Sequence, residues 1–254
     1  MSSDSVPDVC PWDDTETPSG WSTATRAQTF FVPLHYESNY RYPLIVWLHS
    51  DGFNENQVCH VMPHVSTRNY LATGIRAPKS SDASGHRFEW GGGVTALESA
   101  ERTVLQAINR AADQYSVHAE RIVLAGYQRG GEMALRIAMQ NPELFAAAIS
   151  LGGEFGLPNE NLIDRERLRQ RRLPMLWQRS IENQDFSSER FLGEIQAAIS
   201  IKAQLEIRQY RNSDEMNSVV LADLDRWVMD HVVNGAPVVK MNPWDTSPTS
   251  FSDN

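Results

Sequence analysis

The segment from Arg121 to Leu135 places a glutamine where a turn would present a reactive side chain. It reads R-I-V-L-A-G-Y-Q-R-G-G-E-M-A-L, an apolar run followed by a glycine-flanked turn and a helical pattern. In a nucleophile elbow, G-x-S-x-G, a serine occupies a strained turn between strand and helix, and the glycines let both elements approach without Cβ clashes. Gly126 and Gly130 take the flanking positions, but Gln128 is central. Because a carboxamide has no nucleophilic oxygen at ordinary pH, acylation at this position is not expected.

Four segments of the chain resemble one family of enzymes. G-Y-Q-R-G-G-E-M-A-L resembles the G-F-S-Q-G-G-x-M-A-L elbow of the phospholipase/carboxylesterase family, which lies within the α/β-hydrolase superfamily and close to the dienelactone hydrolases. Residues 44–52 (L-I-V-W-L-H-S-D-G) resemble its strand and L-H-G-x-G oxyanion loop. Residues 145–153 and 209–216 resemble the strand and loop after the elbow helix and the last strand with its histidine loop. The resemblance covers about residues 28–233 and implies an α/β-hydrolase fold with a degenerate catalytic triad.

The resemblance places an aspartate at the position of the family's catalytic histidine. The histidine lies in a phrase like Y-x-x-G-H-E, whereas this chain reads Y-R-N-S-D-E from Tyr210 to Glu215, which puts Asp214 at that position. An aspartate has an ordinary pKa of about 4 and is ionised at neutral pH, so it is poorly suited to shuttle a proton. No histidine lies between His118 and His231, and His231 falls in the predicted final helix as a surface residue.

The acidic member of the triad would follow the strand predicted at residues 174–177. Glu182, Asn183 and Asp185 all compete for this position, with Asp185 or Glu182 as the candidate carboxylate. With no imidazole to orient, such a residue is better explained as a loop charge or a helix cap.

The resemblance also assigns His49, Ser50 and Asp51, together with Arg129, to the loops around the oxyanion. Ser50 and Asp51 put a carboxylate beside the turn whose N–H groups would face developing negative charge, and an inward Asp51 would oppose that charge. We expect Asp51 to point to solvent and cap the turn, and His49 to be packed and hydrogen-bonded.

The two triad replacements together predict a pseudoenzyme. In another serine hydrolase, loss of the nucleophile or the histidine alone costs about 10⁶ in turnover. We therefore expect an esterase-like cleft with Gln128, Asp214 and Arg129 at its floor, kept for ligand binding or for assembly.

Two other functions remain open at this point. One is a carboxylic-ester hydrolase with an atypical catalytic set, either Ser50 or Ser150 with His49, or a water between Asp214 and Asp185. The other is a purely structural partner protein, whose complex would not depend on the cleft.

Short β-type runs alternate with helical patterns along the chain, which predicts a mainly parallel sheet with helices on both faces. This is the α/β class, and the resemblance implies about seven to eight strands. The predicted strands are residues 28–34, 42–48, 70–75, 121–125, 145–151, 174–177 and 204–210, and the predicted helices are residues 95–115, 130–140, 188–201 and 218–233. One domain over residues 27–235 is expected. Residues 1–26 and 236–254 are rich in small polar residues and are expected to form a loose arm and a tail.

The bulk composition limits the partners. Formal net charge is −9, and no basic run is long enough to follow a phosphate backbone, so nucleic acid is not expected. The one basic stretch, residues 165–172, is interpreted as a solvated helix or loop.

No segment reaches the roughly 18 apolar residues of a membrane helix, and residues 1–20 lack the features of a signal peptide. Cys10 and Cys59 are the only cysteines. They fit a reducing compartment, offer no disulfide framework and favour a cytoplasmic location.

Two motifs that suggest a metal or cofactor are set aside. His60 and His64 have the spacing of a zinc-binding helix, but they enclose Pro63 and lack the glutamate of H-E-x-x-H. Residues 91–93 are three glycines before a helix, but the G-K-[ST] ending of a phosphate loop is missing. Neither a cofactor nor a metal is expected.

Overall fold

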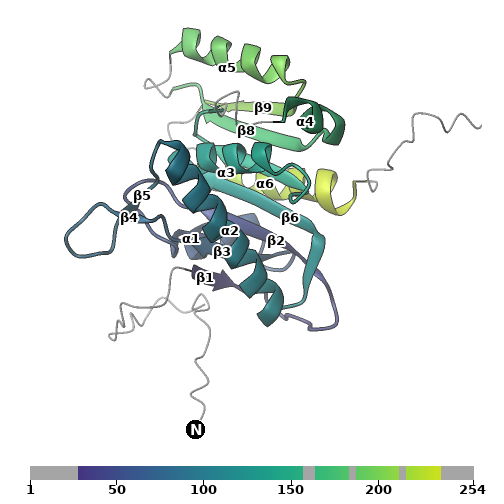
Figure 1. Cartoon of the computed structure of the whole chain (residues 1–254). Coiled ribbons are helices and arrows are strands. Elements are labelled where there is room, and N and C mark those ends of the chain that lie inside the picture. The colour runs from purple at the N-terminus through teal and green to yellow at the C-terminus, as the bar shows by residue number, and fades with distance from the viewer. Residues whose placement is uncertain (1–27, 157–163, 183–186, 212–215, 236–254) are drawn as a thin grey trace, which may run out of the picture.

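The computed structural model describes residues 28–156, 164–182, 187–211 and 216–235. Within them, a seven-stranded sheet runs in the order β1-β3-β2-β6-β7-β8-β9 (Figure 1). Only β1 is antiparallel to its neighbour; the other pairs are parallel. This is the predicted mainly parallel sheet. Its strands are β1 (Gln28–Phe31), β2 (Tyr42–Leu48), β3 (Leu71–Ile75), β6 (Val117–Tyr127), β7 (Ala147–Leu151), β8 (Pro174–Ser180) and β9 (Gln204–Tyr210).

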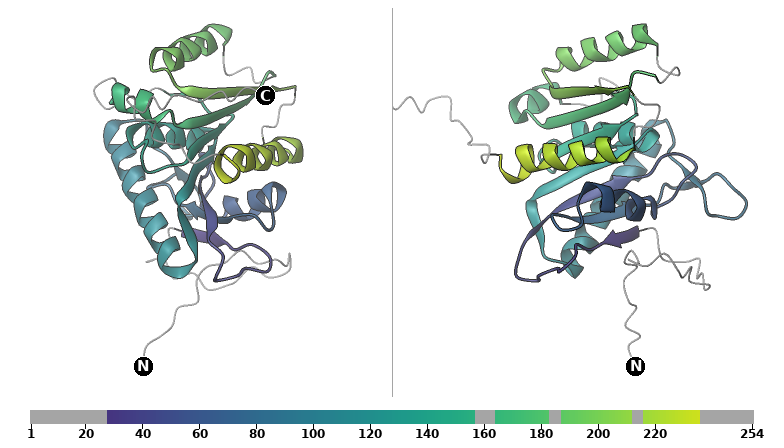
Figure 2. Two further views of the ribbon diagram at one scale, coloured as in Figure 1. Left: turned by 90° about the vertical axis from the view of Figure 1, so that its right-hand side faces the viewer. Right: turned by 180° about the vertical axis from the view of Figure 1, so that it is seen from behind.

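Helices cover both faces of the sheet, as predicted (Figure 2). One apolar cluster joins the sheet to α2 (Val94–Gln114), α3 (Arg129–Gln140), α4 (Arg165–Arg171) and α5 (Ser188–Ser200). A second cluster joins the other face to α1 (Gln57–Val65), α6 (Ser218–Val228) and the π-helix η2 (Met229–Val233). Among the described residues, no helix is both long and apolar enough to cross a bilayer.

The alternation of side chains along each strand explains the two clusters. In β2, Leu44, Val46 and Leu48 belong to the α2–α3 cluster, whereas Ile45 and Trp47 belong to the α1–α6 cluster. Successive side chains of a strand point to opposite faces of the sheet, so a strand that is apolar throughout must be covered on both sides. All seven residues of β2 are buried accordingly.

Apart from shifted strand bounds, the structure differs from the predicted elements most clearly at three places. Helix α1 forms across the segment that contains Pro63. Pro63 lies in the last turn, where only one hydrogen bond of a short helix is lost, and Val58, Val61 and Met62 are buried beneath it. A small pair, β4 (Lys79–Ser80) and β5 (Phe88–Glu89), lies outside the main sheet. The predicted final helix changes to a π-helix at Met229.

The cysteine prediction is wrong in one respect. Cys59 in α1 is disulfide-bonded, and Cys10, the only other cysteine of the chain, lies outside the described residues. Composition could not reveal this bond, because it depends on spatial proximity rather than on cysteine count. The cysteines therefore no longer favour a reducing compartment.

Candidate functional site

The turn between β6 and α3 holds Gln128 in a strained backbone conformation. Its φ is 49° and its ψ is −117°, a region that residues with a side chain rarely adopt. The backbone N–H of Gln128 donates to the carbonyl of Leu151 (2.7 Å), and its carbonyl accepts from the N–H of Glu132 (3.0 Å). The side chain is exposed, and its Nε2 donates to the Tyr127 hydroxyl at 3.3 Å. The turn therefore presents a carboxamide at the carboxyl end of the central strand.

Three glycines allow this turn to approach its neighbours closely. A Cβ at Gly130 would lie 2.2 Å from the Leu48 carbonyl oxygen, and one at Gly126 would lie 2.5 Å from the carbonyl carbon of Gly130. A Cβ at Gly131 would lie 2.6 Å from the Ser150 Oγ. Only glycine fits at such separations. The backbone thus has the geometry of a nucleophile elbow although the central residue is not a nucleophile.

His49, which follows β2, is buried and fully hydrogen-bonded. Its Nε2 accepts from the backbone N–H of Ala77 (3.0 Å), so the hydrogen-bond pattern assigns the ring proton to Nδ1, which donates to the Ser50 carbonyl (2.7 Å). Burial lowers the pKa of His49 below its ordinary value, against smaller opposing effects of the Ser50 hydrogen bond and nearby carboxylates. The imidazole is therefore held neutral, and neither nitrogen is available to take a proton from a nucleophile.

Protonation of His49 is expected to oppose folding in mild acid. Because its folded-state pKa is depressed, the stabilisation from neutral His49 is fully present above the unfolded-state pKa of about 6.5 and is lost as the pH falls through the folded-state pKa. The free energy of unfolding, measured by urea denaturation, should therefore fall as the pH drops below about 6.5. The decline should be smaller in His49→Gln, whose amide does not titrate. Equal declines in both proteins would contradict this assignment.

Asp51 lies on the surface and caps the loop that leads to α2. Its Oδ1 accepts from the backbone N–H of Trp90 at 2.8 Å, and its side chain is exposed. Trp90 is buried and its indole N–H donates to the His49 carbonyl at 2.6 Å. Together these bonds join the segment after β2 to the segment before α2. Trp90 is a positioning residue that sequence analysis did not assign to the oxyanion loop.

The two serines of the alternative catalytic sets are inaccessible. Ser50 is 1% exposed, and its Oγ accepts from the Gln57 side chain at 3.2 Å. Ser150 is 0% exposed, and its Oγ has no hydrogen-bond partner among the described residues. The close approach to Gly131 places Ser150 beneath the elbow. Neither hydroxyl reaches a surface from which a substrate could approach.

Arg129 is held by an ionic network within α3. Its guanidinium pairs with Glu132, which also pairs with Arg136 at 3.3 Å. A methyl group added at Gly92 would lie 2.8 Å from an Arg129 guanidinium nitrogen, so the glycine-rich segment before α2 passes directly over this arginine. The i, i+3 and i+4 spacing of these three residues could have indicated the network from the sequence.

Most of the remaining candidate triad positions lie outside the described residues. Asp214, Asp185 and Asn183 are not among them. Glu182 is described, and its side chain is exposed; its backbone N–H donates to the Ser180 Oγ at 3.0 Å.

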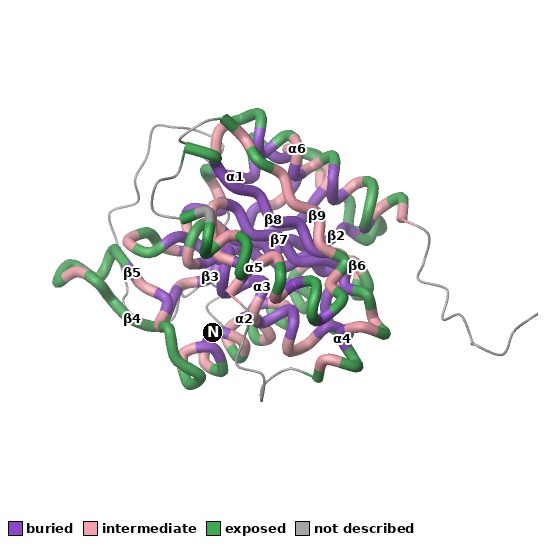
Figure 3. The backbone as a smooth tube through the Cα atoms, turned by 90° about the horizontal axis from the view of Figure 1, so that it is seen from above, coloured by how far each residue is buried: buried purple, intermediate pink, exposed green. Residues whose placement is uncertain are grey.

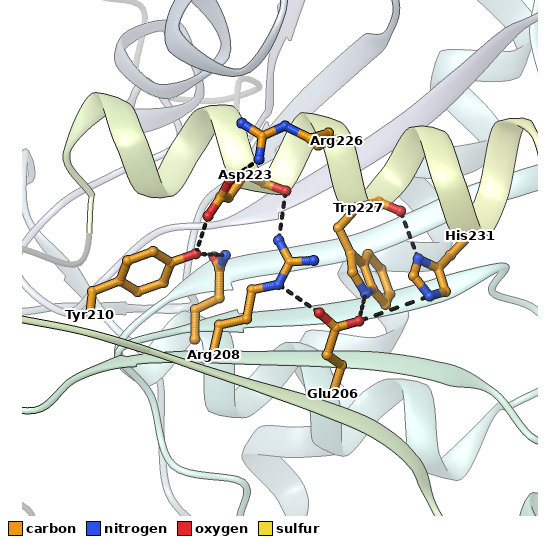
Figure 4. Close-up of polar contacts among 8 residues, drawn as sticks. Glu206, Arg208, Tyr210, Asp223, Arg226, Trp227 and His231 are labelled. Carbon is orange, nitrogen blue, oxygen red and sulfur yellow. Dashed lines mark hydrogen bonds and ion pairs between the residues drawn. The ribbon is translucent and has the colours of Figure 1, made fainter.

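A polar cluster that sequence analysis missed lies at the carboxyl ends of β8 and β9 (Figure 4). Gln178, fully buried, donates from its Nε2 to the Tyr210 hydroxyl (3.1 Å), which donates to Asp223 of α6 (2.7 Å). Burial, followed by the bond to Asp223, raises the pKa of Tyr210 to about 12. Tyr210 therefore stays protonated at neutral pH and ties the end of β9 to α6. The signal in the sequence is Asp223, a carboxylate beside the apolar stripe of the last helix.

A pocket of about 310 Å³ lies near the amino ends of β2 and β3, at the end of the sheet opposite to Gln128. Tyr42 at the start of β2, Arg68 before β3 and Met229 of η2 are among its lining residues. Because parallel strands begin at one edge and end at the other, this pocket is separated from Gln128 by the length of the sheet.

The strand order, the two helical layers and the elbow between β6 and α3 define an α/β-hydrolase fold. Solved esterase structures share it. A carboxylesterase from Bacillus cereus matches with a TM-score of 0.60 and 14% identity, over 79% of this chain and 92% of its own. A carboxylesterase from Mesorhizobium loti matches with a TM-score of 0.61 and 12% identity, over 75% and 90%. A phospholipase/carboxylesterase from Dyadobacter fermentans matches with a TM-score of 0.56 and 12% identity, over 84% and 100%.

No family model and no curated protein matches the sequence. The structure therefore carries the comparison: the chain has the α/β-hydrolase fold that these solved carboxylesterases share.

Proposed function

We propose that this protein is a pseudoenzyme of the phospholipase/carboxylesterase type, in which the edge of the sheet around the elbow binds a ligand or partner without cleaving it. The observation that carries the proposal is Gln128 at the strained elbow position. The surrounding glycines preserve the turn, while the side chain it presents has hydrogen-bonding capacity but no nucleophilic oxygen. A group that both donates and accepts hydrogen bonds suits a polar ligand.

The hydrogen bonds and burial of the other polar residues favour a loss of catalytic activity over an atypical catalytic set. A serine nucleophile needs a base within hydrogen-bond reach of its hydroxyl. The ring nitrogens of His49 are both occupied by backbone groups, and Ser50 and Ser150 are buried. The alternative, a carboxylic-ester hydrolase, would then depend on a water activated by carboxylates alone, and ordinary carboxylates are weak bases at neutral pH.

Hydrolysis of p-nitrophenyl acetate by the purified protein tests the proposal. We expect rates of wild type and Gln128→Ala that equal each other and the rate in buffer. Turnover that is clear in wild type and lost in Gln128→Ala would show that the elbow still performs chemistry. Turnover that is clear and equal in both would place a catalytic site elsewhere; either result would refute the pseudoenzyme proposal.

A further inference from the structure

The last strand of the sheet has one open edge. β9 is terminal in the strand order and pairs only with β8 among the described strands. None of its seven residues is fully buried, whereas β2 and β7 are buried throughout. From above, β9 lies between α5 and α6 and is coloured as partly exposed over most of its length (Figure 3). Open edges of this kind are templates for pairing with a further strand.

Helix α5, beside this edge, has large apolar side chains on its outer surface. Leu192 is 58% exposed and Ile199 is 69% exposed, and their i, i+7 spacing puts them on the same side of the helix. The helix is anchored by Ala198, which is buried, and by Phe191, whose ring packs on Trp177 with centroids 5.3 Å apart. The outer apolar side of α5 is thus not needed to hold the helix on the sheet.

The face of β9 toward α6 carries one charge of each sign. Glu206 and Arg208 are two residues apart, so their side chains share a face. Their side chains are 40% and 27% exposed and pair at 2.6 Å. Trp227 donates its indole N–H to Glu206 at 2.9 Å, and Arg208 donates to the Asp223 carbonyl at 3.2 Å (Figure 4). The pair is oriented by α6 but is still accessible from the open edge.

We infer that β9 is a self-pairing edge, which joins two copies of this chain as an antiparallel β9–β9 pair about a two-fold axis at Ile207. The axis, perpendicular to the sheet, makes the two edges antiparallel and keeps each α5 on the same side as the other copy's α5. In this register Glu206 lies opposite Arg208 of the second copy, and Arg208 lies opposite its Glu206. Opposite charges facing each other across strands stabilise a pair.

Neighbouring registers lack this match. An axis at Glu206 places two glutamates directly opposite each other, and an axis at Arg208 does the same with two arginines; such like-charge pairs are destabilising. The axis at Ile207 is also at the centre of the strand Gln204–Tyr210, so it alone pairs all seven residues. It brings the two α5 helices together, which offers a reason for the exposed Leu192 and Ile199. The charge pattern and the apolar helix surface therefore select a second copy as the occupant. The inference is independent of whether the elbow is catalytic.

Disulfide cross-linking tests the register. Ile207→Cys places two cysteines opposite each other, with Cα atoms about 4.5–5.5 Å apart, within the range for a disulfide. In Gln209→Cys the two cysteines are offset by four residues, about 13 Å along the strands. Under mild oxidation we expect a covalent dimer from Ile207→Cys, and none from Gln209→Cys or wild type. Equal cross-linking of the two variants, or none in either, would overturn the proposed register.

The oligomeric state of the protein tests whether the apolar side of α5 is part of the proposed dimer interface. Size-exclusion chromatography with light scattering is expected to give wild type a molar mass twice the 28.7 kDa of one chain. The double variant Leu192→Glu/Ile199→Glu should be monomeric at the same concentration, because it places four carboxylates at the two-fold axis. Val94→Glu, which changes another exposed apolar residue at the first turn of the distant α2, should remain dimeric. A monomeric wild type, or a dimer that persists in the α5 variant, would overturn the proposal. Circular dichroism of each variant verifies that it is folded.

Discussion

Replacing Gln128 with serine and Asp214 with histidine in the same protein is expected to raise hydrolysis of p-nitrophenyl acetate about 10²-fold above wild type. The turn already has nucleophile-elbow geometry, with φ of 49° at position 128, so a serine there would be presented without rebuilding the backbone. In a related mechanism, loss of the triad acid alone costs about 3 × 10⁴ of the roughly 2 × 10⁶ that the full triad contributes. A serine–histidine pair without an assigned carboxylate should therefore recover roughly 10²-fold.

The two single variants are the controls for this experiment. Because nucleophile and base act as a unit, Gln128→Ser alone and Asp214→His alone should each give rates close to wild type. Adding Glu182→Ala to the double variant tests whether the Glu182 carboxylate orients the new histidine. Lower turnover in this triple variant than in the double variant would identify Glu182 as the acidic member of the triad. If Gln128→Ser alone matches the double variant, a base other than residue 214 operates at the elbow. A double variant that folds but gains nothing would mean that the loops no longer bring positions 128 and 214 together.

A strand or helix could be predicted wherever one pattern of apolar and polar residues dominates its segment. β2 and β9 have the predicted bounds. β2 is a near-continuous apolar run, whereas in β9 the apolar Leu205 and Ile207 alternate with polar residues. The bounds of β6 could not be predicted, since its first half, from Val117 to Arg121, is not buried and is largely polar. Helix α1 was missed because Pro63 is read as a helix breaker, yet tertiary packing of Val61 and Met62 compensates for one lost hydrogen bond.

The elbow position could be predicted from the sequence, and the state of the residues around it could not. Gly126, Gln128 and Gly130 are local in the chain, so spacing alone defines them. The tautomer of His49 depends on Ala77, which comes from a different loop. The burial of Ser150 depends on the close packing of α3 against β7. Long-range contacts of this kind have no periodic signature in a single sequence.

Gly130→Ala is expected to destabilise the fold by about 3 kcal/mol, at the upper end of overpacking effects. A Cβ at this position would lie 2.2 Å from the Leu48 carbonyl oxygen and 2.4 Å from that of His49. Both atoms belong to the backbone at the end of a central strand, so they cannot rotate away as a side chain would. Relief requires α3 to move from β2, which would also open the elbow. Urea denaturation of wild type and variant measures the difference.

Gly193→Ala is the matched control, because it makes the same change inside a helix where space is open. Nothing lies within 4 Å of a Cβ built at Gly193 in α5, so this variant should be stabilised by up to about 1 kcal/mol through helix propensity and reduced freedom of the unfolded chain. Both variants should be measured at one protein concentration, since self-association through β9 would add to the apparent stability. Equal unfolding midpoints for Gly130→Ala and wild type would mean that α3 is not held against β2 as closely as the elbow geometry requires, and the argument for a preserved elbow would fail with it.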